Sequence, residues 1–138
     1  MSLSNEYETK ALKFLFTPEG TNAASGLRPA SLHLGLFTSS PSDTAFGTEV
    51  SATNTNYVRQ AAAFTISGNN ASNTAAIEFA ECGSQNYGNV AAVAILDSST
   101  GGAPTNIIAY ASLTGGAKTI NTGDIFRIPA GDLDINLD

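Results

Sequence analysis

The segment Ser31-Leu32-His33-Leu34-Gly35-Leu36-Phe37-Thr38 carries the alternation of side chains that decides the fold. Every second residue from Leu32 to Leu36 is a leucine, so these leucines share one face of an extended chain. His33, Gly35 and Phe37 share the other face. A period of two residues predicts a β-strand with one face turned toward a core.

Apolar runs of the same kind follow along the chain, separated by Gly, Asn, Ser, Thr and Pro. We expect strands within residues 57–67, 75–79, 90–96, 107–113, 118–120, 125–128 and 133–137. About seven or eight strands at a spacing of roughly 10 residues fit a β-sandwich or a β-barrel. We expect an all-β fold, a single-domain antiparallel β-sandwich over residues 31–138.

The segment Val90-Ala91-Ala92-Val93-Ala94-Ile95-Leu96 differs from the other predicted strands because it is apolar on both faces. This pattern indicates a central strand buried on both sides, or a strand at a subunit contact. Residues 107–113 follow after a Gly-containing turn and are the expected hairpin partner.

Residues 1–30 are expected to form an N-terminal helical arm and a loop. Within residues 5–16, Asn5 can cap a helix, with Glu8 as its capping-box partner. Pro18 then ends the helix, because proline disfavours a helical residue before it. One face of this helix would carry four apolar or aromatic side chains, Tyr7, Ala11, Phe14 and Leu15. The short N-terminal helix could pack on its own domain or dock on a neighbouring subunit.

Residues 39–56 form a long predicted loop with no strong strand pattern. A loop of this length in a small domain is usually functional or contact-forming. Glu49 and Val50 lie at its centre. We therefore expect contacts with other subunits at the helix face, the loop centre and the doubly apolar strand, at Tyr7, Ala11, Phe14, Leu15, Glu49, Val50, Val93 and Ile95.

The composition favours an assembled protein. Charged residues make up only 13% of the 138-residue chain, about half of the usual ~25%, and low surface charge removes one defence against self-association. Six Lys and Arg residues stand against twelve Asp and Glu residues, with no basic run, so we expect no binding of nucleic acid. The longest apolar stretch, 90–96, is too short to cross a bilayer, and no signal peptide is expected, so we predict synthesis in the cytoplasm and no membrane partner.

The sequence contains no cluster of residues typical of an active site, so we expect the protein not to be an enzyme. Its single histidine, His33, has no partner in a nucleophile motif, and its single cysteine, Cys82, allows no intrachain disulfide. Glu78 and Glu81 are the nearest candidates for a glycosidase pair, but charges on the solvent face of a strand explain them more simply. The acidic residues between 132 and 138 alternate along a strand rather than surround a loop, so we expect no metal and no cofactor.

Four segments, taken in order, resemble a family of small tailed-bacteriophage virion proteins that are often labelled tail-fibre-like. They are Leu32 to Thr38 with Pro41 and Asp43-Thr44; Gly47 to Val50 leading to Asn56-Tyr57-Val58-Arg59-Gln60; Tyr87 to Val90 with Val93 to Asp97 and Gly101-Gly102; and Lys118 to Ile120 with Gly123-Asp124, Ile128 to Gly131 and Leu133. The resemblance covers about residues 31–137 and implies a non-enzymatic role in the virion.

We expect the protein to be a capsid decoration, or cement, protein that stabilises contacts between major capsid subunits, and to form a homotrimer. The alternative is a structural, adaptor or host-binding protein of the tail or tail fibre, with tail proteins as partners. In both cases the expected location is the virion.

Overall fold

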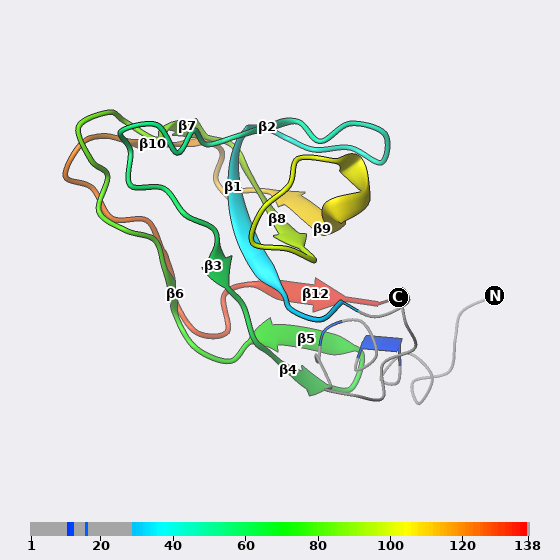
Figure 1. Ribbon diagram of the computed structural model, residues 1–138. Helices are drawn as coiled ribbons and strands as arrows, with labels where there is room; N and C mark the ends of the chain where they lie inside the picture. Colours follow the sequence, from blue (N-terminus) through cyan, green and yellow to red (C-terminus); the bar gives the residue numbers. More distant parts are fainter. Residues whose placement is uncertain (1–10, 13–15, 17–28, 138) are drawn as a thin grey trace.

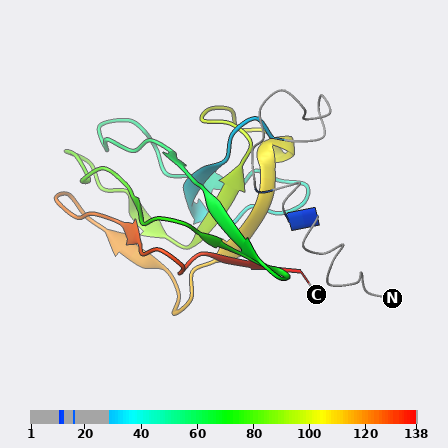
Figure 2. The ribbon, with the colours of Figure 1, turned by 90° about the horizontal axis from the view of Figure 1, so that it is seen from below.

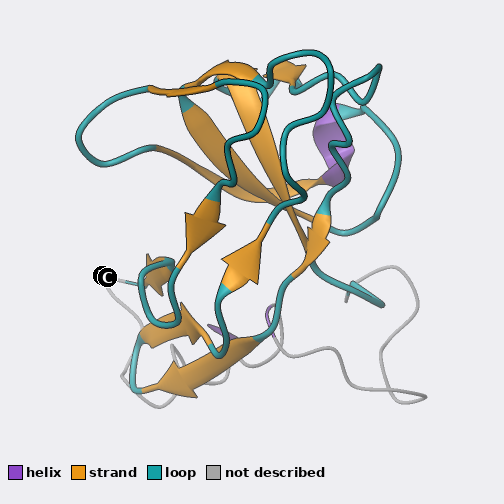
Figure 3. Ribbon diagram, turned by 90° about the vertical axis from the view of Figure 1, so that its left-hand side faces the viewer, coloured by secondary structure: helices purple, strands orange, loops and turns teal. Residues whose placement is uncertain are grey.

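The computed structural model describes residues 11–12, 16 and 29–137 (Figure 1). Twelve short strands among these residues form four antiparallel sheets, which confirms the predicted all-β fold. The strands are shorter and more numerous than the seven or eight expected, and long loops join them (Figure 3). Among the described residues, no helix has the length and hydropathy needed to cross a lipid bilayer.

The largest sheet has five strands in the order β2-β1-β8-β9, with β3 also paired to β1. Its strands are β1 (His33–Ser39), β2 (Thr48–Glu49), β3 (Gln60–Ala61), β8 (Ala92–Leu96) and β9 (Ile107–Ser112). A single 3-10 turn, η1 (Pro104–Asn106), precedes β9. The predicted hairpin of 90–96 with 107–113 is therefore confirmed.

Three smaller sheets complete the fold. They pair β10 (Lys118–Ile120) with β7 (Gly88–Val90), β11 (Arg127–Ile128) with β6 (Ile77–Glu78), and β5 (Asn70–Asn73) with both β12 (Asp134–Asn136) and β4 (Phe64–Ser67). Buried side chains from all of these sheets and from the five-stranded sheet meet in one hydrophobic core, or pack against it.

Strand β8 is buried on both faces, as its sequence predicted. Val93 and Ile95 lie opposite Leu36 and Leu34 of β1 and point into the main core. Ala92, Ala94 and Leu96 point to the other side of the sheet, into a second, smaller core that also contains Phe37. The sequence allowed either a central strand buried on both sides or a strand at a subunit contact, and in the fold β8 is a central strand.

Four predictions of strands and loops need correction. The predicted strand 90–96 is divided between β7 and β8, which belong to different sheets, and β2 lies within the predicted loop 39–56. The segment 57–67 was expected to be one strand, but it is divided into β3 and β4, with two residues between them outside either strand. Strand β5 was not predicted, because its sequence Asn70-Ala71-Ser72-Asn73 is almost entirely polar. It is nevertheless a central strand, paired on both sides, and Asn73 is almost fully buried.

Most of the predicted N-terminal helix over residues 5–16, including Tyr7, Phe14 and Leu15, lies outside the described residues. Of the described positions, Leu12 and Phe16 are buried in the main core and Ala11 is half-buried. The Phe16 ring meets the Phe64 ring edge-on, with 5.6 Å between centroids. At these two core positions the arm packs on its own domain.

Candidate functional site

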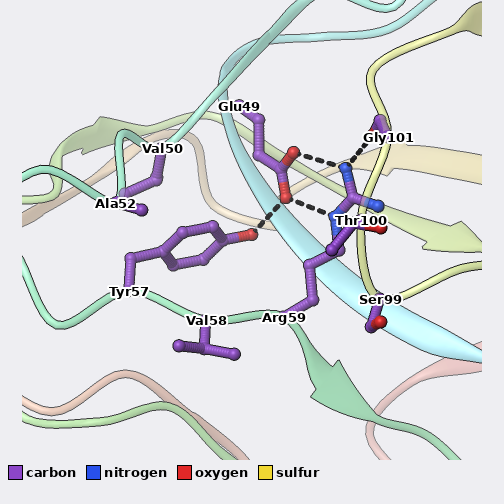
Figure 4. Close-up of a pocket in the computed structure, with 9 residues that line it drawn as sticks. All are labelled: Glu49, Val50, Ala52, Tyr57, Val58, Arg59, Ser99, Thr100 and Gly101. Atoms are coloured by element: carbon purple, nitrogen blue, oxygen red, sulfur yellow. Dashed lines mark hydrogen bonds and ion pairs between the residues drawn. The ribbon is translucent and has the colours of Figure 1, made fainter.

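A surface hollow of about 440 Å³ lies where three parts of the chain meet beside the five-stranded sheet. Strand β2 supplies Glu49, the segment leading into β3 supplies Tyr57 and Arg59, and the turn after β8 supplies residues 99–101 (Figure 4). Val50, Ala52 and Val58 complete its lining. The hollow contains the most buried ion pair among the described residues.

The Arg59 guanidinium forms a two-pronged ion pair with the Glu49 carboxylate. Arg59 Nε donates to Glu49 Oε1 and Arg59 Nη2 donates to Glu49 Oε2, each over 2.7 Å. The Arg59 side chain is 5% exposed and that of Glu49 is 17% exposed. Parallel bonds of this kind are among the strongest and most directional that charged side chains make, so the pair fixes β2 against the segment 57–59.

The Tyr57 hydroxyl joins this pair to the backbone of β1. It donates to Glu49 Oε1 over 2.7 Å and accepts from the backbone N–H of Leu36 over 2.9 Å. Burial, and then the negative charge of Glu49, raise the pKa of the Tyr57 hydroxyl well above its usual range. The phenol therefore stays protonated and serves as a fixed hydrogen-bond donor.

Arg59 also holds the turn that follows β8. Its Nη1 donates to the carbonyl of Ser98 over 2.9 Å, and its Nη2 donates to the carbonyl of Gly101. The ring of Phe46 lies 5.7 Å from the guanidinium carbon, within the range of a cation–π contact. The hydrogen bond to Glu49 is the main cause that raises the pKa of Arg59, so its positive charge is permanent.

The arrangement is suited to holding shape rather than to transferring protons. Both carboxylate oxygens of Glu49 accept hydrogen bonds, and Arg59 donates to three different groups. A general base needs a free lone pair and a pKa near neutrality, and neither Tyr57 nor Arg59 offers both. Among the described residues, no group of three or more His, Cys, Asp or Glu side chains is placed to hold a metal ion.

The structure separates the predicted contact residues into different places. Glu49 lies at the hollow, and Val50 lines it while packing into the main core. Val93 and Ile95 lie in the same core and have almost no exposed surface, so little of either side chain is available to a partner. Ala11 is half-buried, and Tyr7, Phe14 and Leu15 lie outside the described residues. Their role in subunit contacts stays a prediction.

Sequence reasoning did not single out Tyr57, Arg59 or Asn73 as important side chains. Asn73 donates to the carbonyls of Ala75 and Pro129 and accepts from the N–H of Leu133, so it ties β5 to the segment before β12. The low number of charged residues in the sequence was one signal that could have identified Arg59. An arginine inside an apolar stretch of such a chain needs a nearby acidic side chain. No pattern of residue types in the sequence indicated a structural role for Asn73.

One comparison with known proteins identifies a family. The sequence model of a protein family described as "Podophage GP4 fiber I protein gp80" matches residues 2–136. No curated protein matches the chain. The match therefore spans almost the whole sequence, including all four sheets and the hollow around Arg59.

Proposed function

Since the chain belongs to the Podophage GP4 fiber I protein gp80 family, a family of bacteriophage virion structural proteins, we propose that it works as a structural component of a tail fibre. The observation that carries the proposal is the family match over residues 2–136. On this proposal the protein acts through contacts with tail proteins and with copies of itself, and it performs no catalysis.

The construction of the domain supports a mechanical role. A fibre component has to keep its shape while it transmits force between neighbouring subunits. The Glu49–Arg59 pair links three separate parts of the chain at the edge of the five-stranded sheet. Asn73 provides a comparable link on the opposite side of the fold, between β5 and the segment 129–133. These buried polar links are fully used inside the domain, as expected for a rigid building block.

Attachment to the capsid is the second candidate. Decoration of the joints between major capsid subunits was expected from the sequence. The low proportion of charged residues, 13%, favours it, because a surface with fewer charged side chains loses less hydration free energy when another protein covers it. The name of the matching family favours the fibre instead.

The position of the protein on the particle can be measured directly. We would compare cryo-electron microscopy maps of virions made with and without the protein, using a stop codon early in its gene. The fibre proposal predicts that density is lost at the tail while the capsid lattice is unchanged. Density lost over the capsid surface would contradict the fibre proposal and support decoration. Virions complemented with the protein from a plasmid are the control, since they must regain the missing density.

A further inference from the structure

The loop of residues 40–47, which joins β1 to β2, lies against the smaller core on the outer face of the five-stranded sheet, the face turned away from the main core. Its Phe46 ring meets the Phe37 ring of that core edge-on, with 5.3 Å between centroids. The other buried members of the smaller core are Ala92, Ala94 and Leu96 of β8. The loop therefore covers part of the sheet on the side that the main core does not occupy.

The same loop reaches β9, two strands away from β1 in the order β2-β1-β8-β9. The Tyr110 hydroxyl of β9 donates to Asp43 Oδ1 of the loop over 3.1 Å. Figure 2 shows β9 on the outside of the sheet, next to β8 and away from β1. Ala94 lies directly opposite Tyr110 in the ladder, so the two side chains share the outer face. The loop thus crosses this face as a strap, from β1 over β8 to β9.

One weak hydrogen bond holds the strap to the far side of the sheet. Among the described residues, the bond from Tyr110 to Asp43 is the only one that joins residues 40–47 to the rest of the chain. Tyr110 is 41% exposed and Asp43 is also exposed. Such a bond contributes little to stability, because water replaces it when it breaks. This bond, and then the charge of Asp43, raise the pKa of the Tyr110 hydroxyl above its ordinary value, so it stays a donor near neutral pH.

The strap keeps its own shape through internal hydrogen bonds. The N–H of Ser42 donates to the carbonyl of Ala45 over 2.9 Å, and the N–H of Ala45 donates to the hydroxyl of Ser42 over 3.1 Å. Neither bond has to break when the strap moves as a unit. At its base, Gly47 has a φ of 77°, and an added Cβ there would lie 2.5 Å from the Ser39 carbonyl oxygen. The two ends of the strap are therefore packed together, and movement is confined to hinges at Ser40 and Gly47.

The neighbouring loop, residues 97–106, is held far more firmly. The side chains of Arg59 and Asn106 make hydrogen bonds within it at both ends. Gly102 of this loop lies against the Phe46 ring, since an added Cβ at Gly102 would be 3.8 Å from that ring. The strap thus closes against a fixed wall, through one aromatic ring and one exposed hydrogen bond.

We propose that the strap, residues 40–47, opens and closes on its hinges while the rest of the domain stays folded. Phe46 is the plug that seals the smaller core, and the bond from Tyr110 to Asp43 is the latch. The open form is a minor state, because it exposes apolar surface at Phe37 and Ala94 to water. This movement does not depend on where on the virion the protein lies.

Thiol labelling of the full-length protein tests whether the strap opens alone. Ala94→Cys places a thiol in the smaller core, and the matched control Ile95→Cys places one on the other face of β8, in the main core. Mass spectrometry of the labelled peptides scores each site separately from the native Cys82. Ala94→Cys should react about tenfold faster or more, at a rate that changes little in dilute urea, because local opening exposes little surface. The cavity left at residue 95 can only favour reaction of the control.

The latch gives an independent measurement. Adding Tyr110→Phe to Ala94→Cys removes only the latch hydroxyl and should raise the labelling rate about two- to tenfold, as expected for the loss of one hydrogen bond. Thr65→Val removes an exposed side-chain hydrogen bond on β4 and should leave the rate unchanged. In the chain without added cysteines, cleavage by chymotrypsin after Phe46 should respond to Tyr110→Phe in the same direction.

Three results would each overturn the proposal. The first is equal labelling of Ala94→Cys and Ile95→Cys, which would mean that the smaller core opens only when the domain unfolds. The second is a labelling rate, or a cleavage rate, that does not respond to Tyr110→Phe. The third is an equal increase at both sites with Tyr110→Phe, which would show a loss of global stability rather than release of the strap.

Discussion

Replacing Glu49 with glutamine should destabilise the fold strongly, although the side chain keeps its size. The variant removes the negative charge and turns one of the two acceptor oxygens toward Arg59 into an amide donor. Arg59 would still be held in place by the carbonyls of Ser98 and Gly101. A permanently charged guanidinium, 5% exposed, would then lack its counter-charge.

The loss of unfolding free energy expected for Glu49→Gln follows from the burial of the Glu49–Arg59 pair. Removing one partner of a buried ion pair typically costs about 3–5 kcal/mol, because the remaining charge stays desolvated. Glu49 is 17% exposed, so water can reach the site, and we expect the lower end, about 3 kcal/mol. With a urea m-value of about 1.5 kcal/mol/M, the midpoint of unfolding should fall by about 2 M, at an unchanged m-value.

The chain contains a matched control for this experiment. Arg127 and Glu78 form an ion pair between β11 and β6 with an N–O distance of 3.7 Å, and both side chains are more than half exposed. Exposed pairs contribute about 0–1 kcal/mol, so Glu78→Gln should change the midpoint little. If Glu49→Gln and Glu78→Gln lowered the stability equally, or if Glu49→Gln cost less than about 1 kcal/mol, the buried pair would not be the clamp described above.

Three further changes test other parts of the fold. Tyr57→Phe removes the hydroxyl that accepts from the Leu36 N–H, so this buried donor is left without its partner; urea unfolding should show a loss of about 1–3 kcal/mol. Gly47→Ala should lower the stability of the fold clearly more than Gly131→Ala. Both glycines have positive φ angles, but an added Cβ at Gly47 would lie 2.5 Å from a backbone carbonyl oxygen, whereas the space at Gly131 is open. Thermal unfolding of the two variants compares the losses of stability, and equal losses would contradict this account. Burial lowers the pKa of the His33 imidazole below its usual 6.5, so the folded state resists protonation that the unfolded state accepts. The stability that His33 contributes should therefore be fully present above pH 6.5 and decline as the pH falls below it; unfolding measured between pH 7.5 and 5.5 should show this decline in the native chain and a flatter profile in His33→Gln.

Strands β1 and β8 of the central sheet could be predicted from the sequence because each shows its burial pattern in its own side chains. In β1 the leucine alternation marks one buried face, and in β8 the unbroken apolar run marks two. The polar strand β5 has no such pattern. Its position depends on pairing with β4 and β12 and on the hydrogen bonds of Asn73, two of which are made with Pro129 and Leu133, far along the chain.

The candidate site could be predicted only in part, for a related reason. Glu49 was named as a contact residue because of its place in a long loop. Its partner Arg59 was placed in a strand and in a segment of the family resemblance, but no role was assigned to it. Two of the groups that Arg59 binds are backbone carbonyls, at Ser98 and Gly101, about forty residues away. Every residue has a carbonyl, so residue types cannot indicate which ones an arginine will bind. The fold has to be known before these acceptors can be identified.

The clamp at Arg59 and strand β9 are connected through a single stretch of chain. Arg59 holds residues 98 and 101, and Asn106 closes the same loop by donating from its side chain to Asp97 Oδ1 over 3.0 Å. Strand β9 begins at the next residue, Ile107. The loop that sets the start of the edge strand is thus fixed at both ends by charged side chains that lie outside the edge itself. The clamp at Arg59 therefore orders the loop that leads into β9 as well as the hollow itself.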